Sequence, residues 1–406
     1  MTGMRAARTI QAVVGAEYPG KYRDQGFHPV HLGDTFANGR YTVRHKLGYG
    51  ATSTNWLVHD SITRKYASLK IVDATHSPGS QLNVLKHLQS TFDANEEGSQ
   101  YVMEMLDHFV HVGPNGKHLC IVAEVLGLKL TTDIGELWYN EVFPPEVAKR
   151  LVGQVALGVR YLHRRNVAHG DLYQSNILLY SPRIASWSEE DVKKYLGKPV
   201  KDFLQSVDGT PLEDDPSRPK YLVPLPEKSS FLRLCFEHPH VKICDFSEAF
   251  IPTIPHPRKL ATPRLFRPPE GLLGILPHAT LETDIWALAV LMHAIFTGGC
   301  GLFLDGRDDR ILREMVLLLG KLPEPWWSLW AKRSEVFDEE GKLLSTHVKE
   351  TSSSGMFLKV SIGDSEERRN FEELLRSMVR YEPHRRITAE DVVKSHWFVK
   401  YCRIVL

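Results

Sequence analysis

The chain has 406 residues, of which 42% are hydrophobic and 24% are charged, and its formal net charge at pH 7 is +1. This composition is ordinary for a folded protein of one large or two average domains, and it gives no reason to expect a nucleic acid or a membrane surface as a partner. The five scattered cysteines lack metal-ligand spacing, which favours a reduced intracellular protein, and no apolar run reaches the roughly 18 residues of a membrane span.

The first third of the chain shows strand periodicity. Residues 1–40 form an irregular arm rich in Gly, Pro and Tyr, which we interpret as an N-terminal extension. After it, β-branched and aromatic residues alternate with polar ones. The strands predicted from this pattern cover residues 41–44, 54–58, 66–72, 101–103 with Leu106, and 119–123. Leucines three residues apart predict one helix over 81–88, so residues 41–124 should form a small, mostly antiparallel sheet with one main helix.

From residue 125 the apolar period becomes helical. Residues 144–163 predict an amphipathic helix, and residues 283–296 are apolar nearly all round, which indicates a buried central helix. Two segments, 181–239 and 331–367, carry prolines, glycines and mixed charge instead. We interpret both as insertions that are partly ordered at best. The expected fold class is α+β, with a small sheet lobe and a larger, mainly α-helical lobe over 125–406.

A glycine-containing loop joins the first two predicted strands. It reads Leu47-Gly48-Tyr49-Gly50-Ala51-Thr52-Ser53-Thr54-Asn55. Glycines at 48 and 50 let a backbone approach phosphates and donate N–H groups to them, although the same glycines could simply close a hairpin. A dinucleotide-binding loop would open a helix, whereas this one opens a strand. Lys70, in the third strand, is the expected phosphate contact; the alternative is an ordinary solvated strand lysine.

A second polar set follows two short apolar strands farther along. Asp171 and Asn176 lie in His169-Gly170-Asp171-Leu172-Tyr173-Gln174-Ser175-Asn176, and Asp245 follows Val241-Lys242-Ile243-Cys244. Phosphoryl transfer from ATP needs one carboxylate to receive the hydroxyl proton, and an amide with a second carboxylate to hold Mg²⁺. The sequence therefore predicts a phosphotransferase site.

The order of these motifs resembles the eukaryotic protein kinase superfamily. The matching features are Gly48 and Gly50, Lys70, Glu124 at the hinge, His169 to Asn176, Asp245-Phe246, Pro268-Pro269-Glu270, Asp284-Ile285-Trp286 and Arg386. Eight motifs in the same order, spread over residues 41–400, make the resemblance specific. It implies a two-lobed kinase fold, with residues 41–124 as the N-lobe and 125–406 as the C-lobe.

The resemblance narrows to the SR-protein kinases, which phosphorylate serines in arginine/serine-rich splicing proteins. The entry motifs Tyr18-Pro19-Gly20 and Gly33-Asp34-Thr35-Phe36 look like theirs, and so does the hinge Glu124-Val125-Leu126-Gly127. The insertion at 181–239 sits where that family carries its spacer. Residues 319–327 resemble the fungal branch of these kinases.

The resemblance also implies roles for single residues. Asp171 would be the catalytic base, Asn176 and Asp245 would hold Mg²⁺, and Lys70 would touch the α- and β-phosphates of ATP. The further nucleotide contacts implied are Leu47, Gly48, Tyr49, Gly50, Ala51, Thr52, Ser53, Thr54, Asn55, Glu124 and Leu126. Three residues would support the site without reacting: Glu270 and Arg386 as a buried ion pair, and Asp284 as the anchor of the catalytic loop.

Several positions depart from the kinase pattern. Ser53 replaces the third loop glycine, and Asn55 replaces a valine that normally packs on adenine. Gln81 stands where a helix glutamate would neutralise Lys70, so Lys70 should be less well fixed and turnover lower. Ala123, at the gatekeeper position, predicts sensitivity to bulky ATP-competitive inhibitors.

The remaining departures concern the catalytic loop and activation segment. Gly170 replaces the arginine that pairs with a phosphorylated activation segment, so phosphorylation of Ser247, Thr253 or Thr262 should not be needed for activity. Tyr173 replaces a lysine near the γ-phosphate. Ser247 replaces the glycine after Asp245-Phe246, which restricts the backbone there.

The predicted function is therefore ATP- and Mg²⁺-dependent phosphorylation of serine or threonine in protein substrates, and the resemblance implies arginine/serine-rich splicing factors as those substrates. A nucleotide-binding pseudokinase scaffold is the main alternative, favoured by Gln81, Asn55 and Tyr173, and a small-molecule phosphotransferase is a third reading. We expect a monomer without nucleic-acid or membrane partners, in the cytoplasm and nucleus by resemblance alone. Candidate acidic contacts for an arginine-rich substrate are Glu324, Glu339, Glu340 and Asp364.

Overall fold

The computed structural model describes residues 10–75, 79–130, 137, 142–210, 212–226, 229–252, 260–276, 280–299, 301–304, 306–344 and 362–406. The chain divides into two compact units. The first comprises Met1–Gly79, Met103–Leu128 and Tyr180–His238, and the second comprises Ser80–Val102, Lys129–Leu179 and Pro239–Leu406. The predicted helix over 81–88 thus groups with the second unit, and the insertion at 181–239 groups almost entirely with the first.

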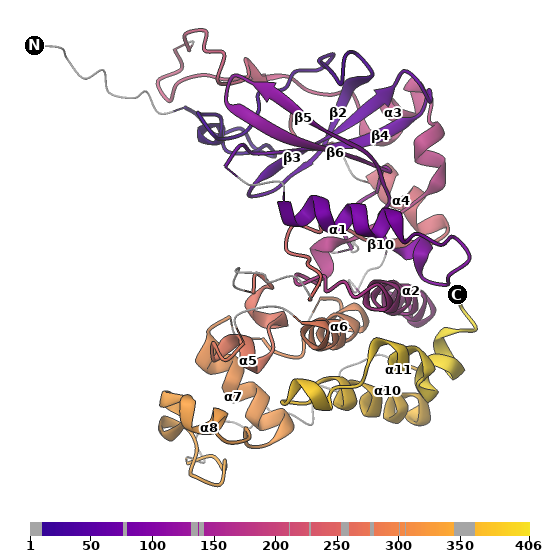
Figure 1. Cartoon of the computed structure of the whole chain (residues 1–406), viewed down its shortest axis with the longest axis vertical. Coiled ribbons are helices and arrows are strands. Elements are labelled where there is room, and N and C mark those ends of the chain that lie inside the picture. The colour runs from indigo at the N-terminus through magenta and orange to yellow at the C-terminus, as the bar shows by residue number, and fades with distance from the viewer. Residues whose placement is uncertain are drawn as a thin grey trace, which may run out of the picture. The chain divides into compact units, whose positions relative to one another are not determined.

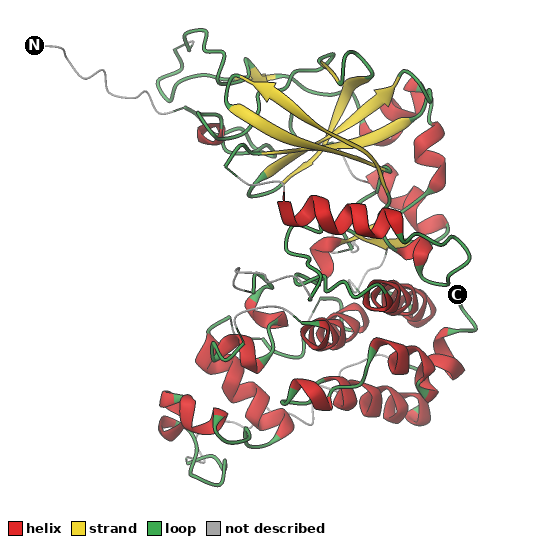
Figure 2. Ribbon diagram, in the orientation of Figure 1, coloured by secondary structure: helices red, strands yellow, loops and turns green. Residues whose placement is uncertain are grey.

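The first unit is built on a six-stranded antiparallel sheet, shown in yellow in Figure 2. Its strands are β1 (Thr35–Phe36), β2 (Tyr41–Tyr49), β3 (Ser53–Asp60), β4 (Tyr66–Val72), β5 (Met105–Gly113) and β6 (Gly116–Ala123), in the order β1-β2-β3-β4-β6-β5. Alternation works as predicted, because side chains two apart share a face. One face carries Val43, Trp56, Leu69 and Val122 into a buried cluster, so the other face carries Lys70.

The strand predicted at 101–103 is wrong. Ser99–Tyr101 form a 3-10 turn, η2, and the strand begins only at Met105 and runs to Gly113. Gly98, with a φ of 110°, starts that turn. A Cβ at Gly98 would lie 2.4 Å from the Leu157 carbonyl oxygen of α2, so only glycine fits where the chain enters this turn.

The N-terminal arm and the first insertion are more ordered than predicted. Val30 and Phe36 of the arm, and Tyr221 and Val223 of the insertion, belong to the same buried cluster as the sheet residues. The described part of the insertion also forms η5 (Pro182–Ser186), α3 (Glu189–Leu196), β8 (Asp202–Phe203), β9 (Tyr221–Leu222) and α4 (Ser229–Glu237). Many of its apolar residues are buried, Leu204, Leu222 and Leu232 among them, and the prolines and charges around them hid this from the sequence pattern.

The second unit is mainly helical (Figure 1). Its longer helices are α1 (Gly79–Ser90), α2 (Pro145–Arg164), α6 (Leu281–Phe296), α7 (Asp308–Leu319) and α10 (Ser365–Met378), and its shorter ones are α5 (Pro269–Leu272), α8 (Trp326–Leu329) and α11 (Ala389–Lys394). The predicted central helix, α6, begins at a capping box in which Thr280 and Thr283 bond each other's backbone N–H groups. Its residues from Thr283 to Phe296 are all buried.

Two short strands complete the second unit. β7 (Ile177–Leu179) pairs antiparallel with β10 (Val241–Ile243).

In the second insertion, Phe337 is buried against Trp327 and Trp330, while residues 345–361 lie outside the described part of the chain. Among the helices that the structure describes, none combines the length and apolar character needed to span a bilayer.

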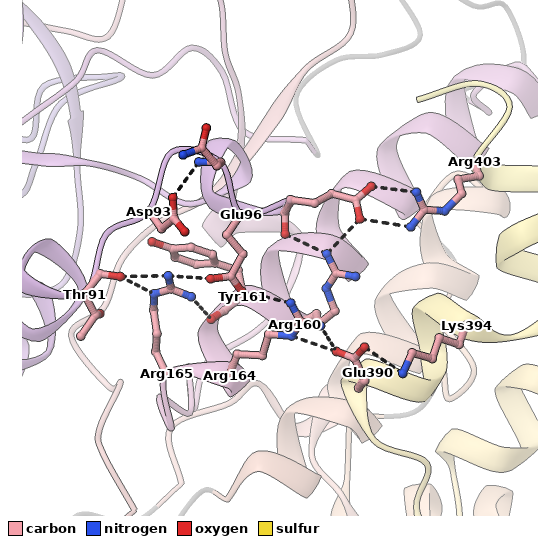
Figure 3. Close-up of polar contacts among 12 residues, drawn as sticks. Thr91, Asp93, Glu96, Arg160, Tyr161, Arg164, Arg165, Glu390, Lys394 and Arg403 are labelled. Atoms are coloured by element: carbon pink, nitrogen blue, oxygen red, sulfur yellow. Dashed lines mark hydrogen bonds and ion pairs between the residues drawn. The ribbon is translucent and has the colours of Figure 1, made fainter.

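An ionic network fixes the segment after α1 to the end of α2 (Figure 3). The Arg165 guanidinium donates to the Thr91 carbonyl oxygen at 2.9 and 3.1 Å, pairs with Glu96 at 2.7 Å, and lies 3.5 Å from the Tyr161 ring centroid. Arg164 bridges Glu96 and Glu390 of α11. Since α2 leads directly into residues 165–176, this network holds the start of the predicted catalytic loop.

Candidate active site

The predicted site residues fall into two groups, one in each unit. The nucleotide-loop residues, Lys70, Glu124 and Leu126 belong to the first unit, and Gln81, Asp171, Asn176 and Asp245 belong to the second. Each group is built by its own local structure.

The glycine loop in the first unit is a tight strand-to-strand turn. The Gly50 N–H donates to the Ser53 carbonyl oxygen at 2.9 Å, and Gly48 lies opposite Asn55 in the register of β2 and β3. A Cβ built at Gly48 would meet no described atom within 4 Å. Protein packing therefore does not require this glycine, and its backbone stays approachable, as a phosphate-binding loop needs.

Lys70 lies in the middle of the sheet on the face opposite the buried cluster. In the strand register it stands between Asn55 of β3 and Ile121 of β6. Ala123, at the end of β6, is buried and shares this face. This face of the sheet thus carries Lys70 and the small side chain of Ala123, the predicted gatekeeper. The nucleotide contacts assigned to this group remain predictions.

The hinge positions follow β6 directly. A Glu124 carboxylate oxygen accepts the Glu104 N–H at 2.9 Å, and Leu126 is buried. Burial, followed by the charge of Glu124, raises the pKa of Tyr180 to about 12. The Glu124 side chain therefore stabilises the local structure by accepting the Glu104 N–H, independently of any contact that the Glu124 backbone makes.

The predicted catalytic loop in the second unit is anchored by the buried carboxylate of Asp284, as expected. Its two oxygens accept the His169 N–H at 2.7 Å and the Gly170 N–H at 3.0 Å, and His163 Nε2 lies 3.2 Å away. Gly170 has a φ of 74°. A glycine adopts this left-handed conformation without strain, so the replacement of arginine is compatible with the loop geometry.

His169 connects this anchored segment to the predicted catalytic residues by hydrogen bonds. Its Nε2 lies 2.9 Å from the Cys244 carbonyl oxygen, so Nε2 carries the proton, and its Nδ1 accepts the Asp171 N–H at 3.3 Å. The Cys244 N–H in turn donates to the Asn176 carbonyl oxygen at 2.9 Å. Backbone bonds thus connect the segments that carry Asp171, Asn176 and Asp245.

Asp171 is held by Asn176 on one side only. The Asn176 amide donates to the Asp171 carbonyl oxygen at 2.8 Å and to carboxylate Oδ2 at 2.9 Å. The other carboxylate oxygen, Oδ1, is buried and meets no hydrogen-bond donor among the described residues. Such an orphaned acceptor costs free energy unless a ligand hydroxyl completes it.

The electrostatics of Asp171 match a proton acceptor. Burial raises the pKa of this carboxyl to about 6; the Asp245 and Glu248 charges act in the same direction, while His169 and the Asn176 amide oppose them. A base whose pKa lies close to neutral pH is well suited to proton transfer.

The donor set fits a magnesium nucleotide. Asn176 supplies an amide oxygen and Asp245 a carboxylate, and Mg²⁺ commonly takes one or two such protein ligands and completes its shell with phosphate and water oxygens. Asp245 has a φ of 60°, a strained conformation that Asp tolerates better than most residues. Its neighbour Phe246 is fully buried, with its ring 5.3 Å from that of His169.

The activation segment is fixed by a buried ion pair and by hydrogen bonds of Thr262. Arg386 and Glu270, both fully buried, form a bidentate ion pair with two contacts of 2.7 Å, as predicted. The Thr262 hydroxyl donates to the Gly170 carbonyl oxygen at 2.7 Å, and Arg267 donates to the Thr262 carbonyl oxygen. Thr262 is buried.

The Thr262 carbonyl oxygen accepts from Arg267, and its hydroxyl is engaged with the catalytic loop. The expectation that phosphorylation of Thr262 is not needed for activity stays a prediction. Loss of activity on Thr262→Ala would therefore report a broken structural bond, not a missing phosphate. Thr253 lies outside the described residues, and Ser247 is the described position that still tests phosphorylation.

Tyr173 and Gln81 are two of the departures from the kinase pattern, and they lie in different elements of the second unit. The Tyr173 ring lies edge-on to Phe266 at 6.1 Å, and burial, followed by the charge of Asp171, raises its pKa, so Tyr173 offers a neutral hydroxyl. Gln81 lies in the first turn of α1 and is 9% exposed.

Most of the acidic candidates for substrate docking have local partners. Glu339 lies 3.6 Å from Arg333, and Glu324 lies 3.9 Å from Lys321 and accepts the Ser328 hydroxyl. Asp364 caps the N-terminus of α10. The Glu339 and Glu324 side chains are nevertheless 72% and 57% exposed, so these pairs are weak surface contacts.

Sequence reasoning missed two contacts that shape the loop. The Thr262–Gly170 bond and the His163–Asp284 contact join residues 92 and 121 positions apart. The motif pattern gave no signal for them, although a threonine eight residues before Glu270 could have prompted a search.

Comparison with known proteins agrees with this geometry. The profile of the protein kinase domain family matches residues 41–188 and 233–398. The serine/threonine-protein kinase SRPK of Physarum polycephalum is 28% identical over 385 residues, covering 91% of this chain and 88% of that protein. The protein kinase dsk1 of Schizosaccharomyces pombe is 36% identical over 162 residues, covering 39% and 30%. SRSF protein kinase 3 of Mus musculus is 34% identical over 200 residues, covering 46% and 35%.

The fold has a solved counterpart as well. The crystal structure of the PF14_0431 kinase domain superposes with a TM-score of 0.63 at 19% identity, covering 92% of this chain and 98% of that one. The predicted α+β kinase fold, the similarity to SR-protein kinases and the assignment to the serine/threonine protein kinases are confirmed at the level of the family.

Proposed function

This chain belongs to the protein kinase domain family, and from that premise we propose that it transfers the γ-phosphate of ATP to serine or threonine hydroxyls of arginine/serine-rich proteins. The observation that carries the proposal is the Asp171 carboxylate. One of its oxygens is held by Asn176, and the other is buried without a partner among the described residues.

In this proposal Asp171 Oδ1 accepts the proton of the substrate hydroxyl. The Asn176 amide orients the carboxylate, and the Asp171 N–H bond to His169 keeps its backbone in place. A pKa of about 6 leaves Asp171 largely ionised at neutral pH and still basic enough to draw the hydroxyl forward.

The remaining predicted residues bind the nucleotide. Asn176 and Asp245 are the proposed Mg²⁺ ligands, and the bound ion would neutralise charge on the transferring phosphoryl group. Lys70 and the backbone of the glycine loop are the proposed phosphate contacts. Tyr173 supplies a neutral hydroxyl where a lysine would supply a charge, which should lower the rate of transfer.

The substrate class rests on the relatives. The Physarum protein is named an SRPK, and the mouse protein an SRSF protein kinase. A splicing-related substrate is proposed on this basis. A location in cytoplasm and nucleus is proposed from the family resemblance of the sequence alone. Glu324 and Glu339 stay proposed contacts for an arginine-rich peptide, because both side chains are more than half exposed and their ion pairs are weak.

The test is phosphate incorporation from labelled ATP and Mg²⁺ into an arginine/serine-repeat peptide and, in parallel, into a generic basic protein. We expect the repeat peptide to be preferred, and Asp171→Ala to lose at least about 100-fold in rate, the usual contribution of a general base. Equal use of both substrates would contradict the substrate class. Nucleotide binding with no incorporation into either would favour the pseudokinase alternative.

A further inference from the structure

A segment of the N-terminal arm, residues 17–27, contacts the glycine loop and the end of the strand that leads into it. We call this segment the strap. It contains the 3-10 turn η1 (Pro19–Lys21), and Tyr22 and Phe27 pack with Leu204 and Leu222 of the insertion in one buried cluster. All of these residues belong to the first unit.

The first attachment lies at the stem of the loop. Glu17 is 2% exposed and pairs at 2.5 Å with Lys46, which is fully buried and stands two residues before Gly48. The Tyr22 hydroxyl donates to the same carboxylate oxygen, and Lys46 Nζ lies 4.1 Å from the Trp56 ring centroid. Because separating two buried charges is costly, the strap and the end of β2 stay together.

The second attachment lies at the tip. Lys21 Nζ donates to the Ala51 carbonyl oxygen at 3.0 Å, and the next carbonyl, that of Thr52, accepts the Asp73 N–H at 2.8 Å. Both carbonyls of the turn are thus engaged. In a planar trans peptide the C=O and the following N–H point in opposite directions. A bond to the Ala51 oxygen therefore aims the Thr52 N–H away from the strap.

We propose that Lys21 is a positioning residue for the nucleotide loop, and this inference rests on the proposed ATP-dependent function. By fixing the Ala51–Thr52 peptide plane, Lys21 presents the Thr52 N–H in advance to a nucleotide phosphate. Its ammonium group also adds a positive charge beside the loop tip. Lys21 touches no reacting atom in this account; it acts through the loop.

The test compares Lys21→Met with Lys21→Arg, and uses Lys65→Met as a control. Lys65 is exposed in the turn between β3 and β4, so this variant removes the same charge from the same unit. We expect Lys21→Met to raise the KM for ATP about threefold to tenfold, the range of a single hydrogen bond, with kcat within about twofold. Lys21→Arg should restore KM, and Lys65→Met should leave it unchanged.

A second readout separates this inference from the proposed function. Amide exchange at Gly50 and Asp73, whose N–H groups donate to the Ser53 and Thr52 carbonyl oxygens of the loop, should be faster without nucleotide in Lys21→Met than in the wild type and in Lys65→Met. If the wild type transfers no phosphate, the proposed function fails, and exchange still decides about the strap. Unchanged exchange at Gly50 and Asp73, or an unchanged KM in an active Lys21→Met enzyme, would overturn the positioning role.

Discussion

The Glu270–Arg386 pair offers a sharp test of how the activation segment is held. Both side chains are fully buried, and two contacts of 2.7 Å join them. Arg386 also donates to the carbonyl oxygens of Arg380, Tyr381 and Glu282. Arg386→Met would strand a carboxylate away from water and release three backbone carbonyls.

The expected cost follows from that burial. Removing one partner of a buried pair costs roughly 3–5 kcal/mol, whereas replacing both with apolar residues is often close to neutral. For a unit of this size each kcal/mol shifts the melting temperature by about 2–4 °C, so Arg386→Met should lower it by roughly 6–20 °C. The double variant Glu270→Leu with Arg386→Met should recover a large part of this loss.

The assay is thermal unfolding of the two single variants, the double variant and Arg376→Met as control. The Arg376–Glu372 pair is partly exposed, at 43% and 33%, so its loss should cost no more than about 0.5 kcal/mol. If Arg386→Met melted like the control, or if the double variant were as unstable as the sum of both single variants, the reasoning about a buried pair would be refuted.

Three further predictions follow from the electrostatics and from the gatekeeper. The rate of transfer should fall below a pH of about 6 with a slope of one proton, because Asp171 acts as a base only when ionised; a flat pH–rate profile from pH 5 to 8 would contradict its role. Burial lowers the pKa of His28 to about 3, and the ring packs 4.4 Å from His111 and 5.1 Å from His118. The folded state therefore favours neutral His28. The contribution of this preference to the free energy of unfolding is fully present above the unfolded pKa of about 6.5 and is lost as the pH falls from there toward 3. Denaturant midpoints measured from pH 7 to 4 should therefore fall less in His28→Phe than in the wild type. Finally, Ala123→Phe should abolish inhibition by bulky ATP-competitive compounds while ATP is still used, and unchanged inhibition constants would show that Ala123 is not the gatekeeper.

Local sequence pattern was sufficient for the main elements. Alternation located β2, β3, β4 and β6, and the apolar run at 283–296 gave the buried helix α6. These predictions succeed because strand and helix faces repeat at fixed periods. The motif order also gave the Glu270–Arg386 pair and the Asp284 anchor, which the contacts confirm.

What the pattern missed depends on partners far away in the chain. Lys46 lies outside the predicted strands, yet it is fully buried in β2 because Glu17, 29 residues earlier, neutralises it. Tyr221 and Val223 lie among prolines and charges, and only the sheet they cover makes them core residues. The strand predicted at 101–103 is wrong because nothing in the local sequence reports that the chain just before it, at Gly98, packs against α2 and forms the turn η2.

The central claim is that Asp171 receives the proton of a substrate hydroxyl while Asn176 holds it in place. Single-turnover phosphate transfer to a serine in an arginine/serine-repeat peptide tests this most directly, with wild type, Asp171→Asn and Asn176→Ala compared at saturating ATP and Mg²⁺. The account predicts that Asp171→Asn loses at least about 100-fold in rate with nucleotide binding retained. A wild-type rate in Asp171→Asn would contradict it.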